Sequence, residues 1–411
     1  MKDFLYDLDI AFVGGVFIED DIVNHSKGNM QFAANALQWN IIEGLDELNK
    51  TPVRLTNAMF IGSFPKFFKT AIIRKKYWHH TDGAKDVNVA FLNIPIYKKF
   101  SRAKNLSYEI KKWAEEDTSK KKILIGYSMD YSVMKALKEA KIKNKEIKTC
   151  LIVPDLPQFM NLENKTSFLY SSLKNIEVVL IRKLEKYIDS FVLLTDYMAK
   201  SLKIEDKPYT VVEGMVKKNQ NIILNNVVNQ AETKIILYTG TLNKQYGILE
   251  LLNAFSQIEK PNYILQICGA GEAEKEIREI VKRDRRIDFK GRISREEALN
   301  LQKKATLLIN PRNDTGEFTK FSFPSKILEY LSSGTPTIAF KLPGIPEEYD
   351  KYLNYIETND IESIGSKIVE MAEKPLKELQ EIGENGKRFV LDKKNNIEQT
   401  KKILNLINST F

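Results

Sequence analysis

Short apolar runs alternate with helix-like segments along almost the whole chain, and this alternation limits the fold more than any other feature. Runs that are continuous in apolar and β-branched residues are typical of strands buried on both faces of a parallel sheet. The pattern therefore predicts an α/β fold in which helices cover both faces of parallel sheets. The expected strands are Asp9–Val13, Val53–Ala58, Val87–Ile94, Ile123–Tyr127, Lys148–Val153, Ser190–Thr195, Tyr209–Glu213, Lys234–Thr239, Tyr263–Cys268, Ile287–Phe289, Ala305–Asn310 and Pro336–Phe340.

The length of the chain predicts two domains, because 411 residues exceed what one ordinary hydrophobic core can hold. The polar stretch 217–234 suits a crossing between the domains and places their boundary near Met215. We therefore expect a first domain of residues 1–215, a second of residues 216–395, and a final helical segment within residues 396–411.

The segment 321–334, F-S-F-P-S-K-I-L-E-Y-L-S-S-G, predicts a short helix whose N-terminus has no side-chain cap. If Pro324 is the first helical residue, the cap position falls on Phe323, whose side chain cannot accept a hydrogen bond. Free amides at a helix N-terminus favour an anion such as phosphate. Lys326 adds a positive charge in the same turn, so the segment predicts an anion site.

A second interpretation of this helix stays open from the local pattern, namely a core helix that carries a Lys326–Glu329 surface ion pair. The flanking runs 305–312 and 335–340 favour the anion site, because both read as buried strands and place the helix in a strand, loop, helix, strand unit. Anions bind at the loop end of such units. Ser325, Lys326 and Glu329 lie three or four residues apart and share one helix surface.

Five motifs follow one another in the second half: L-Y-T-G-T-L-N-K-Q-Y-G-I-L-E-L-L-N-A-F, L-Q-I-C-G-A-G-E, I-D-F-K-G-R-I-S, L-L-I-N-P-R and F-P-S-K-I-L-E-Y-L-S-S-G-T-P. Together, from about Lys234 to Glu348, they resemble the nucleotide-sugar-binding half of glycosyltransferase family 4. The family consists of retaining enzymes with the GT-B fold. The resemblance implies two doubly wound Rossmann-like domains that face each other across a cleft.

The resemblance also assigns a role to each expected domain. Residues 1–215 would bind the acceptor, residues 216–395 would bind the nucleotide sugar, and the helix within 396–411 would pack back on the first domain. The implied reaction moves a sugar from a nucleotide diphosphate donor to a glycan or a lipid-linked acceptor, as in the synthesis of capsule, exopolysaccharide or O-antigen.

The donor site carries over to named positions of the second half. Glu329 is expected to accept hydrogen bonds from the ribose hydroxyls. The backbone at Gly240 and Thr241 is expected to approach the phosphates, and Gly269 and Gly271 to open the base pocket. The full expected donor set is Gly240, Thr241, Gly269, Gly271, Arg292, Ile293, Arg312, Phe323, Pro324, Ser325, Lys326 and Glu329.

The chain departs from the family at three positions. Thr241 and Tyr246 stand where relatives carry the arginine and lysine that neutralise the donor diphosphate, and Phe321 replaces the first glutamate of the family's last motif. Arg312 and Lys326, from adjacent loops, are expected to compensate. Besides a divergent active branch, two alternatives stay open: a catalytically silent nucleotide-sugar-binding subunit that supports a partner transferase, and an epimerase that acts on the nucleotide sugar itself.

Two positions in the first half are expected at the acceptor or the cleft. Gly15 closes the first expected strand, and Asp155 follows another, although a tight turn and a loop cap between two prolines explain them as readily. The histidine that contacts the sugar in many relatives has no counterpart, and we assign no catalytic role to His25, His79 or His80. The catalytic residues stay unassigned, because in the implied mechanism a donor phosphate oxygen helps to deprotonate the acceptor.

The interval 53–112 is strongly basic. It holds thirteen basic and three acidic side chains, a net charge of +10, whereas the whole chain has +9. In residues 60–78 basic residues alternate with aromatic and aliphatic ones, which suits the surface of an anionic membrane. A solvated basic surface over ordinary core aromatics explains the interval equally well. No nucleic-acid-binding module is recognised, and no nucleic acid partner is expected.

The remaining features indicate a cytoplasmic protein that is peripheral at most on the inner membrane face. No apolar run approaches the roughly 18 residues of a spanning helix, and the N-terminus does not resemble a signal peptide. Cys150 and Cys268 lie in strand-like runs and are expected to be buried free thiols. Asp7 and Asp9 mimic the metal-binding aspartate pair of the other major glycosyltransferase fold, but they lie where the chain enters the first expected strand. We therefore expect no metal site, and no cofactor besides the nucleotide-sugar substrate.

Overall fold

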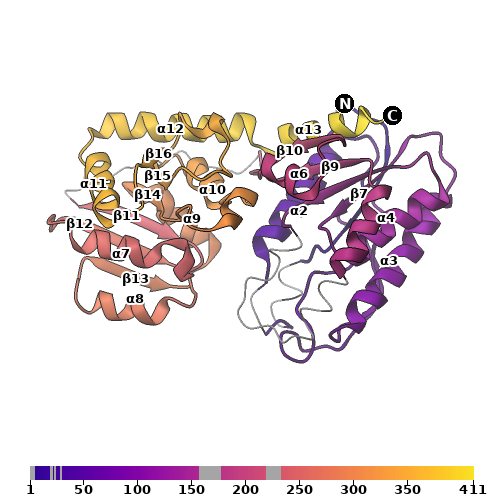
Figure 1. Cartoon of the computed structure of the whole chain (residues 1–411), viewed down its shortest axis with the longest axis horizontal. Helices are drawn as coiled ribbons and strands as arrows, with labels where there is room; N and C mark the ends of the chain where they lie inside the picture. Colours follow the sequence, from indigo (N-terminus) through magenta and orange to yellow (C-terminus); the bar gives the residue numbers. More distant parts are fainter. Residues whose placement is uncertain (1–4, 19–21, 23–24, 28–29, 157–176, 219–232) are drawn as a thin grey trace. The chain divides into compact units, whose positions relative to one another are not determined.

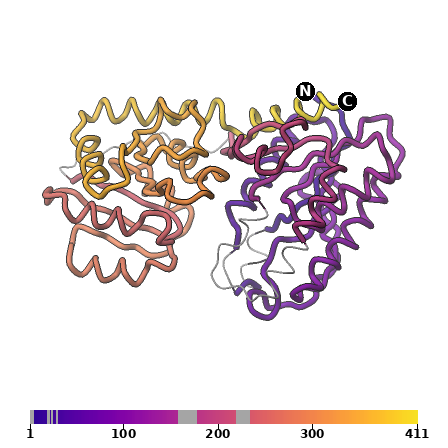
Figure 2. The backbone as a smooth tube through the Cα atoms, viewed as in Figure 1, coloured from indigo at the N-terminus to yellow at the C-terminus, as the bar shows by residue number. Residues whose placement is uncertain are grey.

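The computed structural model describes residues 5–18, 22, 25–27, 30–156, 177–218 and 233–411. The chain divides into two compact units, one formed by Met1–Met215 with Asn396–Phe411 and the other by Val216–Asn395. Each unit is an α/β structure with its own sheet (Figure 1), and Figure 2 traces the backbone through both units.

The first unit is built on an eight-stranded sheet in the order β10-β9-β8-β7-β1-β2-β5-β4, and every neighbouring pair is parallel except β4 with β5. Its strands are β1 Asp9–Gly14, β2 Arg54–Asn57, β4 Lys76–Trp78, β5 Asp86–Asn88, β7 Lys122–Tyr127, β8 Lys148–Val153, β9 Ser190–Leu193 and β10 Tyr209–Val211. A separate antiparallel pair consists of β3 Ile72–Ile73 and β6 Phe91–Leu92. The single strand expected over Val87–Ile94 is therefore divided between β5 and β6.

Helices pack on this sheet and complete its core. They are α2 Phe32–Leu48, α3 Tyr97–Glu115, α4 Tyr131–Lys143, α6 Asp196–Leu202 and α13 Asn396–Asn408, with the short helix η1 Glu185–Tyr187. The last helix, α13, contacts α2 and contributes Ile403, Leu404 and Ile407 to the core (Figure 1). Gly44 of α2 faces Thr400 closely, since a Cβ at Gly44 would lie 2.3 Å from the Thr400 hydroxyl.

The second unit is built on a six-stranded sheet in the order β13-β12-β11-β14-β15-β16, in which all neighbouring pairs are parallel. Its strands are β11 Lys234–Thr239, β12 Tyr263–Cys268, β13 Ile287–Gly291, β14 Leu307–Asn310, β15 Thr337–Phe340 and β16 Asn354–Ile356. Its helices are α7 Ile248–Ser256, α8 Glu274–Val281, α9 Arg295–Lys304, α10 Lys326–Ser333, α11 Ile361–Ala372 and α12 Leu376–Lys393, with η2 Lys244–Tyr246, η3 Glu317–Phe321 and η4 Glu347–Tyr349. Because the strands are parallel, their carboxyl ends share one edge of the sheet.

The start of α10 differs from the expectation. The helix begins at Lys326 with Ser325 as its N-cap, and not at Pro324 with Phe323 as the cap. The Pro324 carbonyl accepts the Ile327 amide at 2.9 Å, so a single tight turn precedes the helix. Phe323 is buried in the core of the unit, which holds it away from the cap position.

Among the other expectations, Cys150 and Cys268 are buried free thiols. None of the described helices has both the length and the apolar character needed to cross a bilayer.

A buried charged triad joins three parts of the first unit. His80, which follows β4, lies 2.8 Å from Asp46 of α2 and 2.7 Å from Asp86 of β5. The two carboxylates also accept backbone amides, Asp46 from Val53 and Asp86 from Leu55. Burial alone lowers the pKa of His80, but the two carboxylates outweigh it and raise the pKa to about 9. His80 is therefore an imidazolium at neutral pH, with both ring nitrogens engaged.

We predict that His80→Gln lowers the free energy of unfolding by about 1 to 3 kcal/mol near pH 6, because two buried carboxylates lose their charged partner. The folded pKa of His80 lies above its unfolded value of about 6.5, so this stabilisation is complete below about pH 6.5 and is lost as the pH rises through about 9. Urea unfolding at pH 6 and above pH 9 measures the difference. His79→Gln, at the exposed neighbour, is the matched control. An equal deficit of the His80 variant at both pH values would contradict the charged triad.

Candidate functional site

The expected donor residues lie on loops at the carboxyl edge of the second sheet. Gly240 and Thr241 follow β11, Gly269 and Gly271 follow β12, Arg292 and Ile293 follow β13, and Arg312 follows β14. Ligands of doubly wound folds bind at this edge. The structure thus brings these loops of the second unit together.

Two of the glycines are required by the packing of one loop on another. Gly269 has a φ of 148°, and a Cβ there would lie 1.8 Å from the Gly240 carbonyl oxygen. A Cβ at Gly271 would lie 2.5 Å from the backbone of Leu242. The Gly240 amide donates to the Cys268 carbonyl at 3.0 Å. The loop after β12 therefore supports the backbone of the loop after β11.

The N-terminus of α10 has no side-chain cap, as the sequence predicts. Ser325 occupies the cap position, makes no capping hydrogen bond and is exposed to solvent. The Lys326 ammonium lies 2.7 Å from Glu329 Oε1, so part of its charge is already balanced. The Lys326–Glu329 ion pair, which the sequence offered as an alternative to an anion site, is therefore present beside the uncapped helix terminus.

A buried hydrogen-bond network fixes Glu329 relative to β11. The Gln302 amide of α9 donates to Glu329 Oε1 at 2.7 Å and to the Thr239 hydroxyl at 2.8 Å. The next residue, Tyr330, is fully buried, and its hydroxyl accepts the Thr239 amide at 2.8 Å and donates to the Thr239 carbonyl at 3.0 Å. Thr239 is the last residue of β11 and precedes Gly240, so the network joins α9, α10 and the phosphate loop expected there.

One oxygen of the Glu329 carboxylate is left for other donors. Both hydrogen bonds from Lys326 and Gln302 reach Oε1, and no group in the described part of the chain donates to Oε2. Burial raises the pKa of Glu329, but the Lys326 charge and the hydrogen bonds from Lys326 and Gln302 outweigh it, so that the pKa is lowered overall. Glu329 is therefore an ionised acceptor with one oxygen fixed and one available.

Arg312 is held between two aromatic rings without a carboxylate partner. Its guanidinium lies 4.8 Å from the ring centroid of Phe318 and 5.4 Å from that of Tyr246, and it donates to the Ser322 hydroxyl at 2.7 Å. Its Nε is buried and has no hydrogen-bond partner, and Arg312 forms no ion pair with any described residue. Burial lowers its pKa, yet an arginine remains charged in proteins. The arrangement suits an anion supplied by a ligand.

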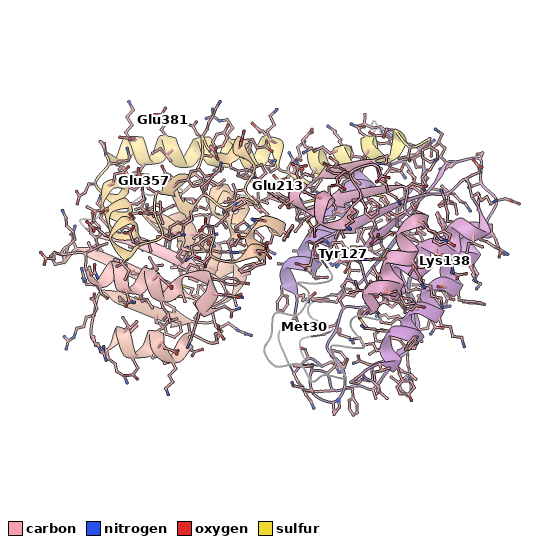
Figure 3. The ribbon with its side chains drawn as sticks, viewed as in Figure 1. Met30, Tyr127, Lys138, Glu213, Glu357 and Glu381 are labelled. Carbon is pink, nitrogen blue, oxygen red and sulfur yellow. The ribbon has the colours of Figure 1, made fainter. Side chains whose placement is uncertain are left out.

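The two expected residues of the first unit lie at the carboxyl edge of its sheet. The Gly15 amide donates to the Gln38 side chain at 2.9 Å, and a Cβ at Gly15 would lie 2.1 Å from the Phe60 ring. The Tyr127 hydroxyl, at the end of β7, is fully buried and has no described hydrogen-bond partner (Tyr127 is labelled in Figure 3). Asp155 keeps contact with solvent, yet desolvation of its carboxyl raises its pKa to about 6.

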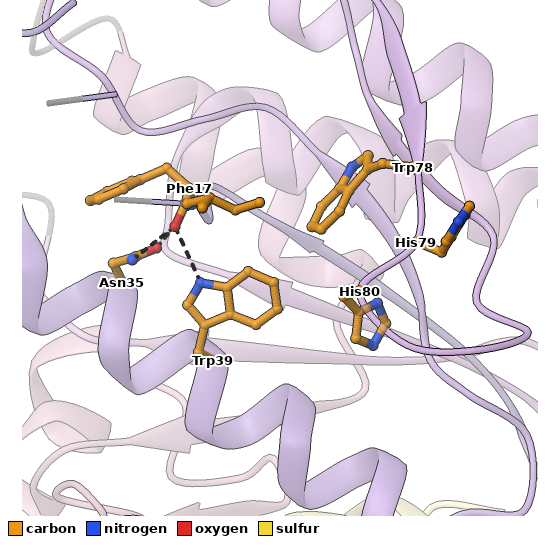
Figure 4. A pocket seen from close by; sticks show the side chains of 7 residues that line it. Phe17, Asn35, Trp39, Trp78, His79 and His80 are labelled. Carbon is orange, nitrogen blue, oxygen red and sulfur yellow. Dashed lines mark hydrogen bonds between the residues drawn. The ribbon is translucent and has the colours of Figure 1, made fainter. Parts of the chain in front are cut away.

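A hollow of about 400 Å³ also lies in the first unit, where α2 meets β4. Its walls are mostly aromatic (Figure 4). The Phe17 carbonyl accepts hydrogen bonds from Asn35 at 3.0 Å and from Trp39 at 3.3 Å. Because His80 uses both ring nitrogens in the charged triad, it offers this hollow no free ring nitrogen.

Comparison with known protein families gives one match. Residues 219–389 match the family described as "Glycosyl transferases group 1". The matched residues all lie within the second unit. No curated protein matches the sequence of the chain.

Solved glycosyltransferases share the fold. Sucrose-phosphate synthase from Thermosynechococcus elongatus is 13% identical with a TM-score of 0.65, and the match covers 98% of each chain. The lipopolysaccharide outer core galactosyltransferase WaaB is 16% identical with a TM-score of 0.62, and the match covers 98% of this chain and 100% of that one. Anabaena HepE in complex with UDP is 12% identical with a TM-score of 0.62, and the match covers 98% of this chain and 100% of that one. The fold of the chain is thus GT-B, as the resemblance implies.

Sequence reasoning missed several residues of the candidate site in the second unit. Gln302 lies in a charged helix and carries no signal of burial, and Thr239 reads only as a strand residue. Tyr330 is visible as the residue after Glu329 in the motif, but its bond to β11 depends on contacts between distant segments. The stacking of Arg312 on Tyr246 likewise joins two separate motifs.

We predict that Tyr330→Phe destabilises the second unit by about 1 to 3 kcal/mol, because the amide and the carbonyl of Thr239 lose a buried partner. Denaturant unfolding measures this loss. Tyr352→Phe is the matched control, since the Tyr352 ring stacks on Phe389 and its hydroxyl has no described hydrogen bond. Equal stability of the two variants would show that the hydroxyl of Tyr330 contributes little.

We predict that Asp155→Asn has a higher free energy of unfolding than wild type at pH 7, and that this difference is smaller at pH 4. The folded pKa of Asp155, about 6, lies above its ordinary value, so ionisation above this pH disfavours the folded state. Solvent screening limits the gain to about 1 kcal/mol. Unfolding curves at both pH values test this, with the exposed Asp206→Asn as control. A pH-independent difference would reject the raised pKa.

Proposed function

We propose that the chain is a retaining glycosyltransferase that moves a hexose from a nucleotide diphosphate donor to a glycan or a lipid-linked acceptor. The group 1 domain supports the sugar transfer, and the structure of HepE, solved in complex with UDP, supports a nucleoside diphosphate donor. WaaB, a lipopolysaccharide galactosyltransferase, supports a role in surface polysaccharide synthesis. The proposal places the protein in the cytoplasm, peripheral to the membrane, with no metal and no cofactor.

One observation carries this proposal. Arg312, a half-buried cation without a described acidic partner, lies over Tyr246, which stands at the position of the family's phosphate-binding lysine. A cation from the loop after β14 thus reaches the neighbourhood that the family lysine occupies. This supports the interpretation that the charge was moved to another loop.

In the proposed mechanism, the donor diphosphate lies against Arg312 and the amides at the start of α10. Both favour the negative charge that develops as the nucleotide departs. Glu329 Oε2 accepts hydrogen bonds from the ribose, while Gln302 and Lys326 hold Oε1. Gly240 and Thr241 bring backbone close to the phosphates, and the loops at Gly269, Gly271, Arg292 and Ile293 flank the base. A phosphate oxygen of the donor assists deprotonation of the acceptor hydroxyl.

The same residues carry a second candidate function. Thr241, Tyr246 and Phe321 remove two cations and one carboxylate of the family pattern, which favours a silent nucleotide-sugar-binding subunit. A panel of nucleotide sugars separates the candidates. Transfer or slow donor hydrolysis supports the enzyme, binding without either supports the silent subunit, and conversion of the donor to an isomer without acceptor supports the epimerase.

We predict different binding losses for the two key side chains. Glu329→Ala is expected to weaken both the best-bound nucleoside diphosphate and its parent nucleoside by about 1 to 3 kcal/mol, because ribose hydroxyls lose a buried acceptor. Arg312→Gln is expected to weaken only the diphosphate, because it removes a phosphate partner. Calorimetry with both ligands measures these losses, and Arg278→Gln, at an exposed arginine of α8, is the control. Equal losses of nucleoside and diphosphate binding in the Arg312 variant would remove Arg312 from the phosphate site.

A further inference from the structure

Six large apolar side chains are exposed around the start of α3 in the first unit. They are 38% to 64% exposed, although such residues usually contribute to cores. We call them the apolar ridge: Ile72, Leu92, Ile94, Ile96, Tyr97 and Phe100.

The members of the ridge are neighbours in space. Ile72 and Leu92 are directly paired across the β3–β6 ladder, so their side chains lie on the same face. The Leu92 amide donates to the Ser101 hydroxyl of α3 at 3.1 Å, which joins the ladder to the helix. Ile94, Ile96, Tyr97 and Phe100 continue along the chain into the first turn of that helix. The ridge is therefore one surface.

Ile96 is held in a strained conformation that exposes its side chain. Its φ of 69° and ψ of −59° form a γ-turn, closed by the Tyr97 amide, which donates to the Pro95 carbonyl at 2.9 Å. A β-branched residue at positive φ is an outlier and is strained. Glycine would adopt this conformation without the strain, so an isoleucine here indicates a use for its side chain.

Basic residues flank the ridge. Arg74 follows β3, Lys76 begins β4 and Lys104 lies one turn beyond Phe100; all three are exposed, and none forms an ion pair with a described residue. The one acidic side chain of α3 before its last residue, Glu109, is paired with Lys75. The surface thus combines exposed apolar groups with unbalanced positive charge.

Exposed apolar side chains combined with unbalanced positive charge favour one kind of binding partner. A second copy of the chain packed on the ridge would bring the same cations against each other in a symmetric interface. An anionic bilayer balances the cations and accepts shallowly inserted apolar side chains. We propose that the apolar ridge is a membrane-docking surface for anionic lipid.

The ridge lies mostly outside residues 60–78, the interval that the sequence indicated for a membrane contact. Only Ile72 belongs to both, and within that interval Phe68 is buried whereas Phe67 and Tyr77 are exposed. The inference deepens the proposed function, because it would bring the first unit to a lipid-linked acceptor. Its test needs neither donor nor acceptor, so it can fail while the proposed transfer holds.

The test is sedimentation of the full chain with vesicles of phosphatidylglycerol and phosphatidylcholine, and with vesicles of phosphatidylcholine alone, at low and high salt. Wild type should bind the anionic vesicles and be released by salt. Phe100→Ser should weaken binding about tenfold, since a phenyl group no longer leaves water. Arg74→Gln and Lys104→Gln should each weaken it about fivefold.

Ile96→Gly keeps the test independent of folding. It removes an inserting side chain and relieves the positive-φ strain, so it should weaken vesicle binding while its melting temperature stays equal to wild type or rises. Ile142→Ser is the matched control. Ile142 is 55% exposed and lies near the end of α4 that is far from the ridge, since Tyr131 at the other end of this helix contacts Phe100. The Ile142 variant should bind vesicles as wild type does. Equal binding to neutral vesicles, wild-type binding by the Ile96 and Phe100 variants, or self-association that these variants abolish would overturn the proposal.

Discussion

The hydroxyl of Tyr330 connects the site to the fold. It bonds both backbone groups of Thr239, at the point where β11 ends and the loop of Gly240 begins. Since Tyr330 follows Glu329 directly, these hydrogen bonds fix the position of the Glu329 backbone relative to the end of β11. Gln302 then sets the carboxylate itself by bonding Oε1 and the Thr239 hydroxyl together. The position of the proposed ribose acceptor thus depends on a buried contact that touches no ligand.

The sequence reveals the sheets better than the site, and the reason is physical. Strands buried on both faces, such as β11, β12 and β14, are continuous apolar runs and can be recognised locally. The strands β4 and β16 are only three residues long, contain polar residues and were not predicted. The start of α10 was misplaced because local rules put proline first in a helix, whereas burial of Phe323 against Tyr349, with ring centroids 5.2 Å apart, fixes the preceding chain.

The departures from the family pattern gain an interpretation only from contacts that join distant segments. The sequence shows that Tyr246 replaces the family's lysine and that Arg312 lies in an adjacent loop, where it is expected to compensate. In the structure, the Tyr246 ring stabilises the half-buried guanidinium of Arg312, which has no described carboxylate partner. Under the proposed function, Tyr246 then supports the charge that Arg312 supplies in place of the family's lysine. No local pattern in the sequence predicts this contact, because residues 247–311 separate the two side chains and only the assembled sheet brings both loops to one edge.

Two groups of charges in the first unit have different surroundings. At His80, two carboxylates surround a buried charge, because an uncompensated ion inside a protein is costly. Around the apolar ridge, Arg74, Lys76 and Lys104 remain in solvent without described partners, beside side chains that water solvates poorly. The stability of the fold explains the charges around His80, but it gives no reason for the unpaired cations around the apolar ridge. A strained Ile96 held outward beside these cations indicates that this face was shaped by an environment outside the protein.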